Sequence, residues 1–212
     1  MTVRLPPSPF LYPILDTEFT TDITGDAQKL IQAGVKILQL RAKNQTKRQI
    51  YDLAVRLTDL CLEQDVLFIV NDYVDVALVT PEAGVHLGQD DFPVREARAL
   101  MDRRLIGFST HSEEQYLVAQ QLPADYIAIG PVFKTTTKPT SDPSLGISNV
   151  SSWLRNKARP VVAIGGIRPD HFPELLQAGV DGIAMISELY RAGNIFETAR
   201  QCVGELRKYE KI

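Results

Sequence analysis

The stretch "YIAIGPVFKTTTK" (residues 126–138) joins a short apolar run to a loop of hydroxyl and ammonium groups. The same order, an apolar run followed by polar residues, recurs along the chain. Seven further apolar runs lie at residues 11–15, 36–40, 67–70, 84–87, 105–108, 161–165 and 182–186. All are too short for a buried helix, and their continuous apolarity is typical of strands covered on both faces. The pattern therefore predicts a parallel sheet.

Helical patterns separate these runs. Residues 46–64 carry apolar side chains at helical spacing, and Thr46 with Gln49 forms a capping-box pattern at the start. Asn194 is a good N-cap for a last helix, in which Glu197 favours the positive end of the dipole. The triplet "AGV" occurs at 33–35, 83–85 and 178–180, each time before a predicted strand. A glycine there can adopt the left-handed conformation that ends a helix.

The number of strand–helix units favours one of two α/β architectures. Eight strand–helix units in 212 residues average roughly 25 residues each, near the lower size limit for an eight-stranded α/β barrel. We therefore predict a single domain over residues 1–212, built as one (β/α)8 TIM barrel. A doubly wound open sheet is the alternative.

The composition restricts the class of ligand. Hydrophobic residues make up 44% of the chain and the formal net charge is -3, which argues against general binding to nucleic acid or to anionic membranes. Cys61 and Cys202 fit neither a metal spacing nor a dense disulfide framework, so we expect buried thiols in a reducing compartment. The N-terminal segment does not resemble a signal peptide, and no segment approaches the length of a membrane span. We expect a cytoplasmic protein and leave self-association into a homo-oligomer open.

Polar residues gather after the apolar runs. In a barrel the carboxyl ends of all strands converge on one face, where barrel enzymes build their active sites. The segments before the runs carry no comparable set, so we expect one functional face. The residues that follow the runs are Arg41, Lys43, Asn71, Asp72, Gln89, Asp90, Asp91, Ser109, the threonine loop, Gly165, Gly166 and Ser187.

The charges in this set suggest a polyanionic ligand. Arg41, Lys43 and Lys138 supply three cations, whereas Asp72 and Asp91 would repel an anion unless a cation lay between them. Magnesium resolves this conflict, because it typically takes one or two protein carboxylates and completes its shell with water and phosphate oxygens. The set predicts a diphosphate bound through Mg2+.

A second phosphate has a candidate place at Gly165-Gly166 and at the turn Ile186-Ser187, because barrels often bind phosphate after their last two strands. The glycine pair also fits a simple turn out of a strand. His86, inside an apolar run, fits a satisfied core histidine better than a metal ligand, and His111 fits either a helix start or an acid–base group.

The diphosphate candidates have simpler interpretations as well. A carboxylate at Asp72 or Asp91 suits the start of a helix, and Arg41 and Lys43 would also fit an exposed loop. Each signal is weak alone, and their joint placement after successive strands favours a functional site.

These residues, in this order, resemble the thiamine-phosphate synthase family over nearly the whole chain. The match rests on "QLRAK" (39–43), "ND" (71–72), "GVHLGQDD" (84–91), "GFSTH" (107–111), "GPVFKTTTK" (130–138), "AIGGI" (163–167) and "IS" (186–187). The resemblance implies a TIM-barrel transferase. It would join 4-amino-2-methyl-5-hydroxymethylpyrimidine diphosphate to a thiazole phosphate, giving thiamine phosphate and diphosphate.

The resemblance also implies roles for individual residues. Asp72 and Asp91 would bind Mg2+, and Arg41, Lys43 and Lys138 would act on the departing diphosphate. The residues implied to hold the pyrimidine diphosphate are Gln39, Leu40, Arg41, Ala42, Lys43, Asn71, Ser109 and Lys138. Those implied to hold the thiazole phosphate are Thr135, Thr137, Gly166, Ile186 and Ser187, and Thr136 is implied as a further substrate-binding residue.

The chain departs from the family pattern on the thiazole-phosphate side. Phe133-Lys134 replaces the more usual Tyr-Pro, and Glu188 follows the expected phosphate turn, where its charge is unfavourable unless it points away. Two alternatives stay open. One is a thiazole tautomerase of the related barrel family, with His111 as the proton-transfer group. The other is a non-catalytic barrel that binds thiamine phosphates.

Overall fold

The computed structural model describes residues 4–135, 143–191 and 193–210. Eight parallel strands pair in chain order, and β1 pairs with β8 to close the barrel. The strands are β1 (Phe10–Asp16), β2 (Ile37–Arg41), β3 (Leu67–Asn71), β4 (Gly84–Leu87), β5 (Ile106–Thr110), β6 (Tyr126–Ile129), β7 (Val161–Ala163) and β8 (Gly182–Met185). The closure confirms the predicted (β/α)8 barrel and rules out the open sheet.

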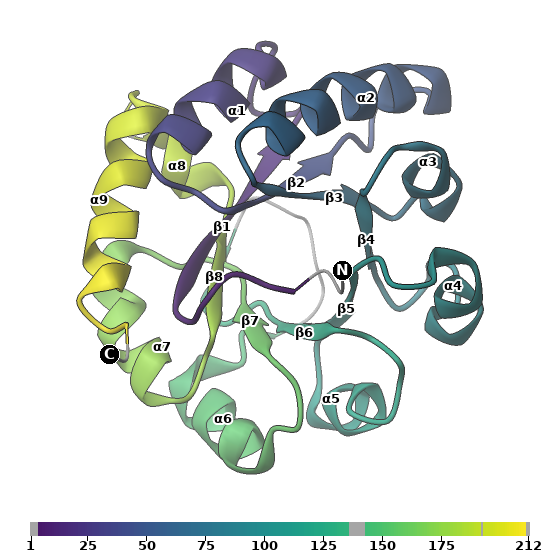
Figure 1. Cartoon of the computed structure of the whole chain (residues 1–212). Coiled ribbons are helices and arrows are strands. Elements are labelled where there is room, and N and C mark those ends of the chain that lie inside the picture. The colour runs from purple at the N-terminus through teal and green to yellow at the C-terminus, as the bar shows by residue number, and fades with distance from the viewer. Residues whose placement is uncertain (1–3, 136–142, 192, 211–212) are drawn as a thin grey trace.

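The helices lie around the outside of the strands (Figure 1). They are α1 (Ile23–Gln32), α2 (Lys47–Glu63), α3 (Val74–Val79), α4 (Val94–Met101), α5 (Glu113–Ala119), α6 (Gly146–Trp153), α7 (Phe172–Gln177), α8 (Ser187–Arg191) and α9 (Ile195–Arg207), with short 3-10 turns η1 (Leu154–Asn156) and η2 (Pro169–His171). Both predicted caps are confirmed. Thr46 and Gln49 bond reciprocally at the start of α2, and the side chain of Asn194 accepts from the Glu197 N–H.

The repeated "AGV" glycines do not all play the same part. Gly34 and Gly179 adopt left-handed φ angles of 95° and 98° as predicted. The prediction is wrong for Gly84, which lies inside β4. A Cβ there would lie 2.6 Å from Ile69 Cδ1 and 2.7 Å from the Leu105 carbonyl oxygen. At Gly84 the glycine is needed for close packing inside the barrel, since the left-handed residue of this turn is Glu82.

Buried apolar side chains form two clusters. The larger one lies between the strands and the helices and includes the thiols of Cys61 and Cys202, which are free as predicted. Burial raises the pKa of both thiols to about 12. The smaller cluster fills the barrel and contains Phe10, Tyr12, Ile14, Ile37, Ile69, Leu105, Tyr126, Ala128, Val162 and Ala184. Leu5 packs against this inner cluster from the segment that crosses the near mouth of the barrel in Figure 1.

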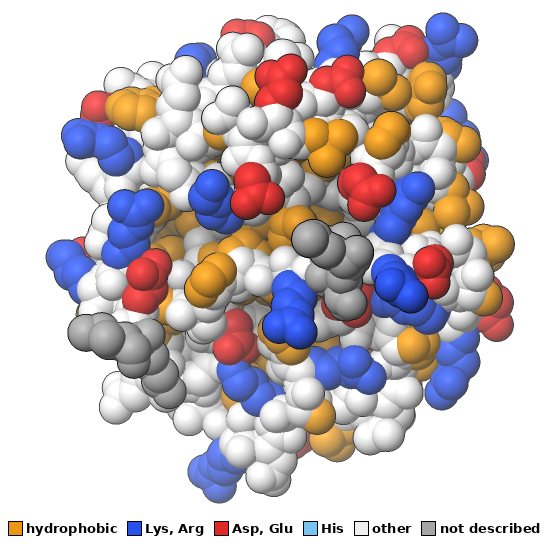
Figure 2. Space-filling model, in the orientation of Figure 1, with side chains coloured by type: hydrophobic (Ala, Val, Ile, Leu, Met, Phe, Trp, Pro, Cys, Tyr) orange, Lys and Arg blue, Asp and Glu red, His pale blue; other side chains and the backbone are white. Residues whose placement is uncertain are grey.

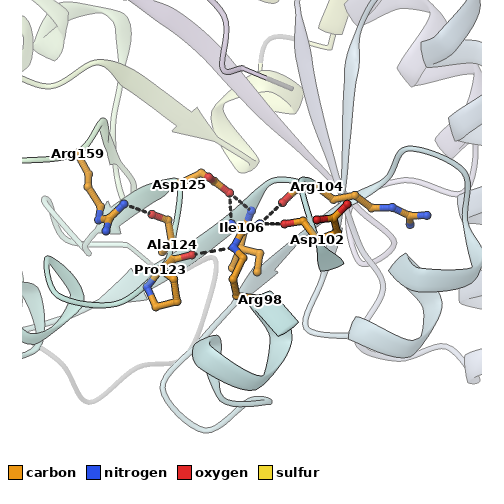
Figure 3. A network of polar contacts seen from close by, with 8 residues as sticks. All are labelled: Arg98, Asp102, Arg104, Ile106, Pro123, Ala124, Asp125 and Arg159. Carbon is orange, nitrogen blue, oxygen red and sulfur yellow. Dashed lines mark hydrogen bonds and ion pairs between the residues drawn. The ribbon is translucent and has the colours of Figure 1, made fainter. Parts of the chain in front are cut away.

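The amino-terminal ends of the strands carry a charged network, shown in Figure 3. Arg98 donates to the carbonyl oxygens of Pro123, Asp102 and Arg104 at 3.1, 2.7 and 2.8 Å, and it lies 2.5 Å from the Asp125 carboxylate. The same carboxylate accepts from the Ile106 N–H, which begins β5, at 2.7 Å.

An equivalent arrangement lies at the start of β7. Asp181 accepts from the Val161 N–H at 2.8 Å and pairs with Lys157 at 2.5 Å. The expectation that the segments before the strands carry no comparable polar set is therefore wrong. These charges bond to one another and to the backbone, and they fix the starts of the strands.

The exterior at this end is electrically mixed. Figure 2 shows basic and acidic side chains interspersed around the near mouth. Within residues 4–135, 143–191 and 193–210, no helix has the length and apolarity needed to cross a membrane.

Candidate functional site

The carboxyl-terminal ends of the strands surround two cavities that meet. The smaller, of about 130 Å³, is lined by Ile14, Gln39, Arg41, Asn71, His86, Ser109, His111, Gly130, Pro131, Thr135, Ile164, Gly165 and Ile186. The larger, of about 300 Å³, is lined by Lys134, Thr135, Ile164, Gly165, Gly166, Ile167, Arg168, Ala184, Met185, Ile186, Ser187, Glu188 and Arg191. Thr135, Ile164, Gly165 and Ile186 line both, so the cavities are neighbours and two ligands bound here would lie close together.

Arg41 ends β2 and reaches the smaller cavity. Its guanidinium pairs with Asp16, which ends β1 and is fully buried, and lies 3.7 Å from Glu18. A buried carboxylate holds an arginine in one orientation, because leaving either charge alone would be costly. Sequence reasoning missed Asp16, although an acid that closes the apolar run "LYPIL" was a visible signal.

The two predicted metal-binding carboxylates lie side by side. The Asp91 carboxylate is within hydrogen-bonding reach of Asp72 and accepts from the Gly88 N–H at 2.6 Å. Lys43 pairs with Asp72 at 2.7 Å. Burial, and then the neighbouring Asp72 carboxylate, raises the pKa of Asp91. Two carboxylates pressed together in this way favour a shared cation.

Neither carboxylate caps a helix, so the simpler interpretation of both is wrong. Tyr73 is the N-cap of α3 and Pro93 that of α4, and neither helix start receives a side-chain cap. Asp72 instead has a left-handed φ of 66°, an unusual conformation for a non-glycine residue. In this conformation its carboxylate lies beside Lys43 and Asp91.

The carboxylate pair fits a hard divalent cation. Among the residues that the structure describes, no three His, Cys, Asp or Glu side chains gather closely enough to hold a metal. A metal at Asp72 and Asp91 would therefore draw its other ligands from water and substrate oxygens, the usual pattern for magnesium.

The "QLRAK" stretch is divided between two environments. Gln39 and Arg41 line the smaller cavity. Leu40 and Ala42 belong to the outer apolar core, so they can offer a ligand only their backbone. Lys43 lies at the rim beside Asp72.

The polar residues of β3, β4 and β5 converge on the smaller cavity. Asn71, Ser109 and His111 line it. His86 bonds through Nδ1 to the Tyr126 hydroxyl and through Nε2 to Ser109 Oγ, which confirms the satisfied core histidine. His111 Nδ1 bonds to the Gly130 carbonyl oxygen at 2.6 Å.

The glycine pair after β7 is required by a close crossing. Gly165 and Gly166 have φ angles of 99° and 63°. A Cβ on Gly166 would lie 2.5 Å from the Lys134 carbonyl oxygen. The Phe133 N–H donates to the Gly165 carbonyl at 3.0 Å, so the loop after β6 lies directly on this turn. The pair therefore turns the chain out of β7 at a close crossing, and because the same turn lines both cavities, phosphate binding there stays a prediction.

Cations that the sequence reasoning missed surround the larger cavity. Arg168 and Arg191 line it together with Lys134. Glu188 also lines it and pairs with Arg191 at 3.0 Å, which offsets the charge that looked unfavourable beside a phosphate. Arg168 is held by both oxygens of Asp170, at 3.2 and 2.9 Å. Arg168 and Arg191 lie several residues after the ends of β7 and β8. The sequence alone therefore did not show that they would line this cavity.

The loop after β6 is closed at its base. The Leu145 and Gly146 N–H groups donate to the carbonyl oxygens of Pro131 and Val132 at 2.8 and 2.9 Å. Phe133, which replaces the more usual Tyr, stacks on His171 with ring centroids 3.9 Å apart. Three predicted ligands, Thr136, Thr137 and Lys138, lie outside the described residues.

Comparisons with known proteins agree with this geometry. The family model described as thiamine monophosphate synthase matches residues 11–189. The thiamine-phosphate synthase of Dictyoglomus turgidum is 37% identical over 86% of this chain and 82% of its own length. That of Chloroflexus aurantiacus is 40% identical over 81% of this chain and 79% of its own.

A solved structure extends the likeness to the fold. A thiamine phosphate pyrophosphorylase from Pyrococcus furiosus superposes with a TM-score of 0.87 at 33% identity, covering 94% of this chain and 96% of that chain. A barrel with these polar groups at its carboxyl end, matched by sequence and structure over most of its length, belongs to the thiamine monophosphate synthase family.

Proposed function

We propose that the chain joins 4-amino-2-methyl-5-hydroxymethylpyrimidine diphosphate to a thiazole phosphate, releasing thiamine phosphate and diphosphate. The observation that carries this function is the pair of cavities that meet at Thr135, Ile164, Gly165 and Ile186. A transferase of this kind must hold two substrates in contact, because the bond forms between them. Membership of the family supplies the substrate class.

The smaller cavity and its rim would take the pyrimidine diphosphate. Gln39, Asn71 and Ser109 offer hydrogen bonds to the ring and its substituents, and Arg41 and Lys43 offer charge to the diphosphate. Because Asp16 holds Arg41 in place, its guanidinium requires little reorganisation as the leaving group gains charge. We propose that Lys138 also supplies positive charge to the diphosphate.

Asp72 and Asp91 would hold Mg2+ at this rim. When bound, the ion supplies positive charge to the departing diphosphate oxygens. The protein's contribution is to present the two carboxylates together, with the Gly88 N–H and Lys43 fixing one each.

The larger cavity would take the thiazole phosphate. Gly166, Ile186 and Ser187 are the proposed phosphate turn, and Arg168 and Arg191 add nearby positive charge. Thr135 lies where the cavities meet, and Thr136 and Thr137 are proposed as further ligands from the same loop.

The chemistry follows from positioning and charge. The bond between the pyrimidine methylene carbon and the diphosphate oxygen breaks, and its electron pair leaves with the diphosphate. The thiazole nitrogen then forms a bond to the same carbon. This route needs no protein nucleophile, so holding the substrates in contact accounts for much of the rate.

The test is thiamine phosphate formation from both substrates, with magnesium varied, for the parent and for Asp91→Ala. We expect magnesium-dependent product and a loss of about 10²–10³-fold in the variant. Glu82→Ala is the matched control, since Glu82 lies before β4 at the opposite end of the same strand. Folded parent protein that forms no product would refute the proposal.

One observation keeps the thiazole tautomerase as a second candidate. His111 lines the smaller cavity, and its Nδ1 bond to the Gly130 carbonyl places the proton of the neutral ring on Nδ1. The Nε2 lone pair is then the basic site. Isomerisation of a thiazole carboxylate phosphate that depends on His111, without transferase activity, would favour the tautomerase. Binding of thiamine phosphates with neither activity would favour the non-catalytic barrel.

The remaining predictions concern the setting of the enzyme. We propose one catalytic domain over residues 1–212 that acts in the cytoplasm on small phosphorylated molecules. Self-association into a homo-oligomer is tested by sedimentation of the purified chain.

A further inference from the structure

A chain of hydrogen bonds crosses the interior of the barrel beneath the smaller cavity. Gln39 Nε2 donates to the Tyr12 hydroxyl at 2.9 Å, and the hydroxyls of Tyr12 and Tyr126 lie 2.8 Å apart. The Tyr126 hydroxyl lies 3.0 Å from His86 Nδ1, and His86 Nε2 lies 2.8 Å from Ser109 Oγ. The chain thus links five strands, and both of its ends line the cavity.

The interior is shaped around this chain. Tyr12, Gln39 and Tyr126 are buried to within 2% of full burial. A Cβ on Gly107 would lie 2.1 Å from Tyr126 Cζ and 2.4 Å from His86 Nδ1, so the glycine makes room for their contact. Burial raises the pKa of both tyrosines, which keeps both hydroxyls protonated.

The chain has a direction, because each hydroxyl has one hydrogen to donate. The Gln39 amide nitrogen can only donate, so Tyr12 accepts from it. Leaving the buried Tyr12 hydrogen without an acceptor would be costly, so we assign it to the Tyr126 oxygen. Tyr126 then donates to His86 Nδ1, which places the imidazole proton on Nε2.

The two ends therefore have opposite polarity. His86 Nε2 donates to Ser109 Oγ, so the hydroxyl hydrogen of Ser109 is not used by the chain. At the other end the Gln39 amide turns its nitrogen to Tyr12 and leaves Oε1 for the cavity. The cavity is offered an acceptor at Gln39 and a donor at Ser109.

We propose that Tyr12, Tyr126 and His86 are positioning residues that select a 4-aminopyrimidine over a 4-oxopyrimidine. An aminopyrimidine carries an amino donor next to a ring-nitrogen acceptor, which matches Gln39 and Ser109. A 4-oxopyrimidine carries a carbonyl acceptor next to a ring N–H and presents the reverse. To accept it, every bond of the chain would have to turn round together. The inference rests on the proposed function for its substrate class.

The first test compares dissociation constants for the 4-amino and 4-oxo pyrimidine diphosphates, measured by calorimetry with magnesium. The ratio of the two constants should fall about tenfold in Tyr126→Phe and in Tyr12→Phe, because either change cuts the chain. Tyr116→Phe is the matched control, since Tyr116 is a buried tyrosine whose hydroxyl has no hydrogen-bond partner in the described part of the chain. Its ratio should stay within about twofold. Equal loss for both ligands in the folded Tyr126 or Tyr12 variant indicates simple packing and overturns the proposal.

The second test reads the proton positions directly, through the imidazole nitrogen resonances of the ligand-free parent. His86 should have its proton on Nε2, and His111 should have the opposite tautomer because Nδ1 donates to Gly130. In Tyr126→Phe the His86 resonances should move while those of His111 stay. A His86 proton on Nδ1 in the parent overturns the proposed direction.

Failure of this inference is separable from failure of the proposed function. A parent that prefers the amino ligand through the chain but forms no thiamine phosphate contradicts only the transferase. A parent that forms product while both tyrosine variants keep the full preference contradicts only the chain.

Discussion

The two ends of the barrel hold charged residues in different ways. At the amino end, Arg98 bonds to three carbonyl oxygens and pairs with Asp125, so its donors are used to hold the backbone. At the carboxyl end, Arg41 is held by Asp16 from behind and still lines a cavity. The number of charges at an end is therefore a poor guide to function. What distinguishes the ends is whether a charged group keeps a face toward a cavity after its partners are satisfied.

The largest effect is expected when Arg41, the charged group that faces the cavity, is replaced. Arg41→Met should lower kcat/KM for thiamine phosphate formation by about 10²–10³-fold, because it removes a fixed charge from the proposed position of the departing diphosphate. It should also destabilise the fold, since the buried Asp16 loses its partner. Arg41→Lys keeps the charge and should lie between parent and Arg41→Met in both measurements. Activity of Arg41→Met within threefold of the parent would contradict the assignment.

The second effect concerns Arg98. Arg98→Met should lower the free energy of unfolding by about 2–4 kcal/mol, because several backbone carbonyls and Asp125 lose a donor together. Urea denaturation measures it. The exposed pair of Arg200 with Glu197 is the control, and Arg200→Met should change stability by less than about 0.5 kcal/mol. The folded Arg98 variant should keep the parent's kcat/KM, and a large loss of rate would remove the distinction between the two ends.

A smaller effect compares two glycines. Gly166→Ala should cost about 1–2 kcal/mol of stability, because its φ is 63° and a Cβ would meet the Lys134 carbonyl oxygen. It should also raise the KM for the thiazole phosphate. Gly204→Ala, in α9 with open space around the new Cβ, should stabilise the protein by about 0.5–1 kcal/mol. Equal effects of the two changes would show that the loop crossing at Gly166 adjusts freely.

The smallest effect on stability is expected at Asp91, where stability and activity should change in opposite directions. Asp91→Asn keeps an acceptor for the Gly88 N–H but removes a charge beside Asp72. The folded protein raises the pKa of Asp91, so the carboxylate form lowers stability at pH values above that pKa, and this cost disappears as Asp91 takes up a proton. Without magnesium, the variant should be more stable than the parent at neutral pH, by at most about 1 kcal/mol because the pair is partly exposed. The difference should shrink as the pH falls into the acid range, while catalysis is lost. A variant less stable than the parent at neutral pH would show that the carboxylates do not repel each other.

The features that could be predicted from the sequence are those that depend on residues close together in the chain. Short apolar runs specify strands, and the caps at Thr46 and Asn194 depend on residues three positions away. The convergence of Arg41, Asn71 and Ser109 followed from barrel geometry alone. The features that were missed depend on which strands become neighbours. Asp16 acquires its meaning from Arg41 across β1 and β2, and Tyr12 meets Tyr126 only because the barrel closes.

The closed base of the loop after β6 has a consequence for how such chains diversify. Two backbone hydrogen bonds join the start of this loop to its end. The geometry of the barrel therefore does not depend on how many residues lie between them. Lengthening a closed loop is inexpensive, with each doubling costing only about 0.6 kcal/mol. Insertions and substitutions between Phe133 and Leu145 can therefore accumulate without altering strand register. Descendants of one barrel can be tuned to different second substrates through this loop while Arg41, Asp72 and Asp91, which lie outside it, are inherited intact.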